Sequence, residues 1–88
     1  MINPFMVVRR GHKNFDSIHG KDESDFYVIS VHKTKIPAES KMIKVSKAMG
    51  ERSNLYYPIV YKVDTDKQYK KGDWLTWDEL RQVAYFVA

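Results

Sequence analysis

The residues best suited to chemistry in this 88-residue chain are its basic side chains, which occur in short clusters. Lysine and arginine total 15 against 11 acidic residues, which gives a net charge of +4. Clustered cations bind phosphate groups through charge and counterion release, so nucleic acid is the expected partner, with RNA preferred over DNA. The expected phosphate contacts are Arg9, Arg10, Lys33, Lys35, Lys41, Lys44, Lys47, Lys70 and Lys71.

Three histidines offer a second kind of chemistry. With Lys13 and Lys33 nearby, these histidines could supply the acid, base and phosphate clamp of a small metal-independent ribonuclease; they are His12, His19 and His32. Their spacing is not diagnostic of such an enzyme. Two of them lie in a polar segment that we expect to be mobile, which is a poor place to preorganise a site. The ribonuclease therefore remains an alternative to a protein that acts by binding alone.

Other catalytic and cofactor-dependent classes find no support in the sequence. The chain has no cysteine, which excludes a disulfide framework, a thiolate metal site and a thiol nucleophile. Its four glycines stand apart at positions 11, 20, 50 and 72 and form no phosphate-binding loop. No ligand spacing supports a zinc site built from the histidines and the acidic residues at 22–25. We therefore expect no cofactor, no metal and no enzymatic activity.

Hydrophobic periodicity predicts the elements that must position the basic clusters. The apolar runs Phe5–Val8 and Phe26–Val31 are expected strands, and the second is apolar on both faces, which is typical of a central strand. Residues Pro37–Met49 are an expected helix whose lysines lie away from its apolar stripe. Ile43 does not fit that stripe, so a strand over Lys41–Lys47 is the alternative. The stripe consists of Ala38, Met42, Val45 and Met49.

The position of the basic clusters depends on how these elements meet. Arg9 and Arg10 close the first strand, and Lys33 and Lys35 follow the second. If the two strand ends are adjacent, these residues join the helix lysines in one basic patch. The sequence does not decide whether they meet.

Residues Asn54–Asp64 form the clearest predicted strand, because apolar residues alternate along it with period two. Pro58 cannot donate a hydrogen bond to a neighbouring strand, which indicates an edge strand or a bulged one. An edge strand with alternating tyrosines could pair with a second copy of itself. We therefore expect a homodimer, with Tyr57 and Tyr61 at its interface.

The final predicted helix begins with a capping box at Thr76–Glu79, and its apolar stripe runs to Val87. A short strand, Asp73–Leu75, is expected before it. Tyr85 and Phe86 lie off the stripe, so one or both are expected to protrude as interface anchors, and the alternative is that the end of the helix packs into the core. A protein-interaction module that inhibits a host enzyme is therefore the other alternative function.

Together these elements predict one α+β domain over residues 1–88, with a polar loop at about 11–25. The expected core is a small antiparallel sheet of three to four strands with two helices, in the order β-β-α-β-(β)-α. The start of the chain lacks the pattern of a signal peptide, and no run approaches the ~20 apolar residues of a membrane span. We expect a cytoplasmic protein with no membrane contact.

The profile resembles the small early proteins of T4-like bacteriophages, which are short, cysteine-free and rich in lysine and tyrosine. Within that group, the basic dimeric inhibitors of toxin–antitoxin ribonucleases bind RNA and are the most similar functional type. The resemblance is carried by Arg9-Arg10, the Lys33–Lys47 cluster and Lys70-Lys71. It is one of overall character, and it implies a phage counter-defence or regulatory role in the host cytoplasm.

Overall fold

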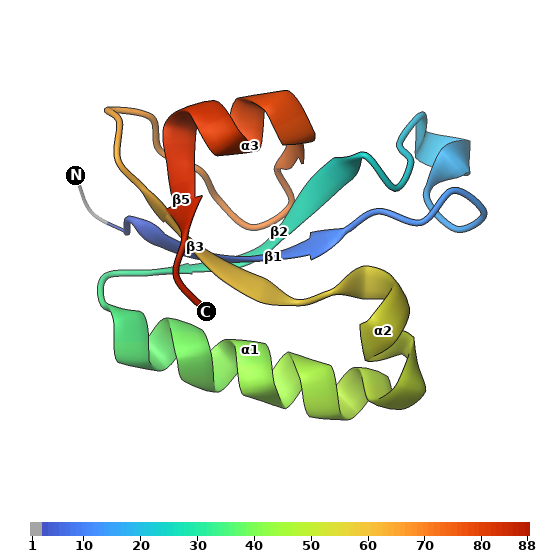
Figure 1. Ribbon diagram of the computed structural model, residues 1–88, viewed down its shortest axis with the longest axis horizontal. Helices are drawn as coiled ribbons and strands as arrows, with labels where there is room; N and C mark the ends of the chain where they lie inside the picture. Colours follow the sequence, from blue (N-terminus) through green and yellow to red (C-terminus); the bar gives the residue numbers. More distant parts are fainter. Residues whose placement is uncertain (1–2) are drawn as a thin grey trace.

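Five strands form one antiparallel sheet between two layers of helix (Figure 1). In the computed structural model, which describes residues 3–88, the strands lie in the order β4-β2-β1-β3-β5. The α+β class is therefore confirmed, with five strands in place of three to four. The strands are β1 (Phe5–Arg10), β2 (Asp25–His32), β3 (Ile59–Val63), β4 (Trp74–Thr76) and β5 (Ala84–Phe86).

Two longer helices cover the sheet, and shorter helical segments fill the connections between elements. Every helix within residues 3–88 is too short or too polar to span a membrane. The longer helices are α1 (Lys35–Met49) and α3 (Trp77–Val83), and the shorter segments are η1 (Ser17–His19), η2 (Gly50–Arg52) and α2 (Ser53–Tyr56).

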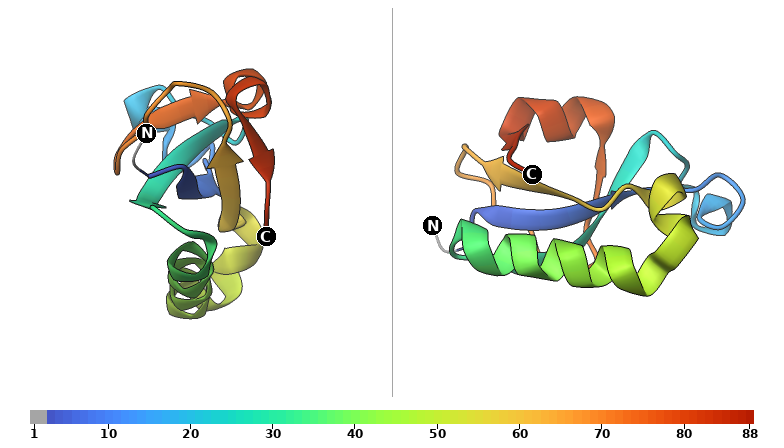
Figure 2. Two further views of the ribbon diagram at one scale, coloured as in Figure 1. Left: turned by 90° about the vertical axis from the view of Figure 1, so that its left-hand side faces the viewer. Right: turned by 60° about the horizontal axis from the view of Figure 1, so that its bottom comes forward.

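Side chains of β1 alternate between the faces of the sheet, and each face carries its own apolar cluster. Val7 lies on the α1 face, where it clusters with Ala38 and Val60. Met6 and Val8 lie on the α3 face. Figure 2 shows the resulting arrangement, with α1 and α3 on opposite sides of the sheet. The rest of the cluster on the α3 face is Phe26, Val28, Tyr61, Val63, Leu75, Leu80, Val83 and Ala84.

Helix α1 confirms the predicted helix and starts two residues earlier, at Lys35. Its apolar stripe turns towards the sheet, with Ala38 fully buried, while its lysines are exposed. Ile43, the residue that did not fit, is 49% exposed, and the alternative of a strand at Lys41–Lys47 is wrong. Gly50 ends the helix with a φ of 59°, and its N–H donates to the carbonyls of the last turn.

The strand predicted over Asn54–Asp64 is correct only in its second half. Its first residues continue α1 as further helical turns, and Tyr57 ends them with a φ of 50°. A residue before proline avoids the helical region, so Pro58 forces this end and β3 begins at Ile59. Strand β3 lies between β1 and β5, so the prediction of an edge strand is wrong. Tyr61 is consequently buried rather than at an open interface.

The final predicted helix is correct at its start and wrong at its end. The Thr76 side chain accepts a hydrogen bond from the N–H of Glu79 at 3.1 Å, as the capping box predicts. The helix then stops, and Ala84–Phe86 form β5, with Phe86 opposite Tyr61 of β3. The apolar end of the chain thus fills a neighbouring position in the sheet. The stability of this strand comes from pairing with a distant segment of the chain, and a helical pattern in the sequence does not reveal such pairing.

Hydrogen bonds close the polar loop between β1 and β2, which we expected to be a mobile connection. The N–H of Gly11 donates to the carbonyl of Asp25 at 2.8 Å, across the base of the loop. The N–H of Lys21 donates to the carbonyl of Asp16 at 3.2 Å, beside η1. Gly11 is required at this closure, because a Cβ there would lie 2.1 Å from the backbone oxygen of Asp22.

We predict that Gly11→Ala lowers the free energy of unfolding by roughly 1–3 kcal/mol, because the closing strand ends must move apart. For a domain of this size each kcal/mol lowers Tm by about 4–8 °C, which thermal denaturation followed by circular dichroism will detect. Gly20→Ala is the control, since its φ is positive at 75° but its Cβ would meet open space. A Gly11→Ala variant no less stable than Gly20→Ala would contradict the closure.

Candidate functional site

Antiparallel pairing separates the two basic strand ends. Arg10 lies opposite Phe26, while Phe5 lies opposite His32, so β1 ends where β2 begins. Arg9 and Arg10 are therefore at one end of the sheet, and Lys33 and Lys35 follow the other end. The condition for one continuous patch is not met.

The net charge of the chain is concentrated around α1. Residues 33–52 contain six of the 15 basic residues and two of the 11 acidic ones, so the remainder of the chain has nine of each. Within residues 3–88, none of the five lysines at 33–47 forms an ion pair. All five are exposed, and α1 runs along the whole sheet (Figure 1). We use the name α1 basic face for the four lysines of α1 and the lysine two residues before it, which are Lys35, Lys41, Lys44, Lys47 and Lys33.

Several basic side chains elsewhere are neutralised by nearby carboxylates. Lys67 lies 3.7 Å from Glu79 and Arg81 lies 2.7 Å from Asp78. Lys70, one of the expected phosphate contacts, lies 3.2 Å from Asp73. Its neighbour Lys71 is exposed on the turn before β4. The cations of the 67–81 segment thus lie within a mixed-sign surface, unlike those of the α1 basic face.

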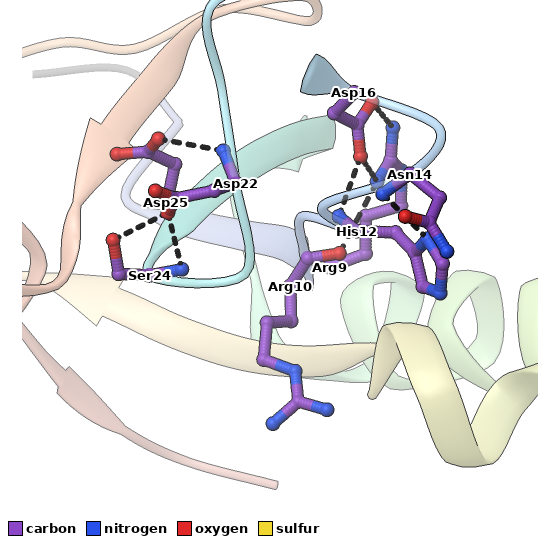
Figure 3. A network of polar contacts seen from close by, with 8 residues as sticks. All are labelled: Arg9, Arg10, His12, Asn14, Asp16, Asp22, Ser24 and Asp25. Atoms are coloured by element: carbon purple, nitrogen blue, oxygen red, sulfur yellow. Dashed lines mark hydrogen bonds and ion pairs between the residues drawn. The ribbon is translucent and has the colours of Figure 1, made fainter.

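Arg9 is held in a mostly buried network (Figure 3). Its guanidinium donates to both carboxylate oxygens of Asp16, at 3.2 and 3.3 Å, and the side chains are 12% and 2% exposed. The N–H of His12 also donates to Asp16, at 2.7 Å. Arg9 therefore anchors the polar loop, and its charge is already balanced. The rings around its guanidinium are Tyr27 at 4.8 Å, Tyr56 at 4.9 Å and Trp74 at 5.5 Å.

This network lowers the pKa of Asp16 below its ordinary value of 3.8. Burial alone would raise the pKa, but the hydrogen bonds from Arg9 and from the His12 N–H, with the nearby positive charge, outweigh it. Asp16 is thus a charged, hydrogen-bonded residue in the lining of a cavity of about 450 Å³. The cavity is lined by Arg9, Phe15, Asp16, His19, Lys21, Tyr27 and Trp74.

Arg10 points to the other face of the sheet and has a different environment. Figure 3 shows its side chain directed away from the Asp16 network. Its Nε is buried and has no hydrogen-bond partner among residues 3–88, and its guanidinium lies 5.5 Å from the ring of Tyr57. It lines a cavity of about 530 Å³, which we call the aromatic groove. The other lining residues are Phe26, Tyr57, Ile59, Tyr61, Trp77 and Phe86.

The aromatic groove collects three of the four expected interface residues, namely Tyr57, Tyr61 and Phe86. The fourth, Tyr85, is exposed on the opposite face of β5. The secondary structure that brings these three residues together was not predicted from the sequence. Tyr57 follows α2, and Phe86 reaches the groove only because the last segment is a strand.

The three histidines do not form one site. His32 ends β2, opposite Phe5, and its Nε2 lies 2.9 Å from the Ser30 hydroxyl. Its pKa is lowered by burial and by the charge of Lys41. His12 and His19 lie in the polar loop at the other end of the sheet. In residues 3–88, no group of three or more histidine or carboxylate side chains could hold a metal ion.

The fold and these two surfaces define a small α+β sheet protein with a basic helix on one face and an aromatic groove on the other. Comparison with protein-family models, curated proteins and solved structures gave no match to this chain. Its function is therefore inferred from the side chains themselves.

We predict that Asp16→Asn lowers the free energy of unfolding by about 3 kcal/mol at neutral pH, because Arg9 loses its buried partner charge. Asp78→Asn removes an exposed ion pair and should cost under about 1 kcal/mol. Urea denaturation of both variants measures the difference. Equal losses in the two variants would contradict a structural role for the Arg9–Asp16 pair.

The same pair predicts a pH dependence. Because the pKa of Asp16 is lower in the folded state, its stabilising contribution is complete above the unfolded value. The contribution disappears as the pH falls through the folded pKa, below 3.8. The stability difference between the wild type and Asp16→Asn should therefore shrink steadily below that pH. A difference that stays constant into strong acid would contradict this origin.

Proposed function

We propose that this protein binds nucleic acid, RNA in preference to DNA, through the α1 basic face, and that it acts by occupancy. The observation that carries the proposal is the confinement of the net charge to residues 33–52, where the lysines form no ion pair with any residue from 3 to 88. Unpaired lysines on one helix can exchange their counterions for phosphates without first breaking protein contacts.

The shape of α1 suits a phosphate backbone. Its 15 residues extend over roughly 20 Å, at about 1.5 Å per residue, which is long enough to follow several phosphates. Ile36 and Ile43 are exposed on the same helix and offer apolar contact to sugars beside the charges. Lysine contacts to phosphate carry no sequence information, so we expect weak sequence preference.

The proposed biological role is consistent with binding by occupancy. A regulatory or counter-defence role in a host cytoplasm, as the phage resemblance implies, requires only that the protein cover an RNA. A homodimer stays a prediction. Pairing of two copies through β3 no longer supports it, because the edge strands of the sheet are β4 and β5.

We predict that replacing Lys41, Lys44 and Lys47 together by Gln lowers the log–log salt dependence of RNA binding by about 2 and weakens binding about a hundredfold near 0.1 M salt. Gln retains helix propensity, so the fold should persist. Fluorescence anisotropy of a labelled single-stranded RNA, and of a DNA duplex, across a salt series gives both quantities.

The matched control replaces Lys67, Lys70 and Arg81 by Gln, which removes the same charge from the mixed-sign surface. Its binding should stay within a few-fold of the wild type. Absence of binding at low salt, or an equal loss in the control, would contradict the proposal.

A further inference from the structure

Two consecutive arginines of β1 lie among aromatic rings on opposite faces of the sheet, and only one has a counter-charge. Arg9 is neutralised by Asp16. Arg10 forms no ion pair within residues 3–88, and its buried Nε has no hydrogen-bond acceptor there. Arg10 is therefore the unpaired cation among the residues that line the aromatic groove, and an anionic group there would balance its charge.

The exposed aromatic residues of the aromatic groove lie together rather than singly on the surface. Tyr57, Trp77 and Phe86 are 57%, 44% and 60% exposed, and all three border the same groove. Its volume of about 530 Å³ falls within the ~300–1,000 Å³ of small-ligand sites. Clustered exposed aromatic residues of this kind mark interaction surfaces.

A free strand edge lies beside the groove. Strand β5 ends the sheet order, and Phe86 belongs to both the strand and the groove. The N–H of Asp64 donates to the carbonyl of Val83, so the backbone groups of Phe86, in alternation with it, point away from β3. The N–H of Ala84 already donates to the carbonyl of Leu80, so Phe86 supplies the outward N–H of this edge. Residues 84–88 contain no charged side chain and no proline to block pairing.

We propose that the aromatic groove and the β5 edge bind an extended acidic peptide segment of a partner protein. The segment adds to β5 as a further strand, places a carboxylate on Arg10 and inserts an apolar side chain between Trp77 and Phe86. A second copy paired through β5 brings no acidic side chain to Arg10 from that strand, because residues 84–88 contain neither Asp nor Glu. Nucleic acid cannot pair with a strand edge, and the groove offers it only one cation.

This site is independent of the proposed nucleic-acid function. The aromatic groove lies on the α3 face of the sheet, with Phe26 and Tyr61, whereas α1 covers the other face (Figure 2). Both ligands can therefore be bound at once, and each proposal can fail without the other.

The experiment is a selection of displayed random peptides against the full chain and against its Arg10→Gln variant. The wild type should enrich peptides with Asp or Glu within a few residues of an aromatic or large aliphatic residue. Arg10→Gln should lose the acidic enrichment. Absence of binders, or acidic enrichment that persists in Arg10→Gln, would overturn the proposal.

The affinities of the wild type and of single variants for the best selected peptide, prepared synthetically, test where the peptide binds. Arg10→Gln and Phe86→Ala should each weaken binding about tenfold or more, whereas Tyr85→Ala, on the opposite face of the same strand, should not. In a Trp74→Phe background, peptide binding should shift the emission of the remaining Trp77. Peptide binding in this groove would be refuted if Tyr85→Ala reduced the peptide affinity equally. It would also be refuted if oligouridylate competed with the peptide and quenched the emission of Trp77.

Discussion

The rest of the structure depends on β1, which is paired along both edges and packed on both faces. It lies between β2 and β3, and its three central residues, Met6, Val7 and Val8, are fully buried. Because side chains alternate along a strand, β1 supplies both apolar clusters and sends its two terminal arginines to opposite sides. The positions of α1 and α3, the Asp16 network and the aromatic groove all follow from this central strand.

Local patterns predicted the elements whose causes are local. The period of α1 placed its lysines on the surface, and the Thr76 cap fixed the start of α3 correctly. One error occurs where distant pairing overrides local preference: β5 exists because β3 has an open edge some twenty residues earlier in the chain, and this contact has no local signal. The other error is local, because Pro58 marks the end of α2 and the start of β3, whereas we interpreted it as the sign of an edge strand.

The two candidate sites also differ in how much of each can be predicted from local sequence patterns. Clustered lysines on one helix are visible in the sequence, whereas the difference between Arg9 and Arg10 is not. That difference depends on whether a polar loop folds its one buried carboxylate beneath a given strand residue. Asp16 had no distinguishing pattern in a segment with several acidic residues, since its burial arises only when β1 and β2 pair and close the loop.

The concentration of charge at residues 33–52 also makes the molecule an electric dipole across its sheet. An approaching polyanion exerts a torque on such a dipole, so most encounters begin with α1 foremost. The opposite layer, with α3 and its aromatic groove, then faces solvent. If both proposed ligands bind, this orientation leaves the aromatic groove facing outward, and the protein would then act as an adaptor between a nucleic acid and a peptide-bearing partner.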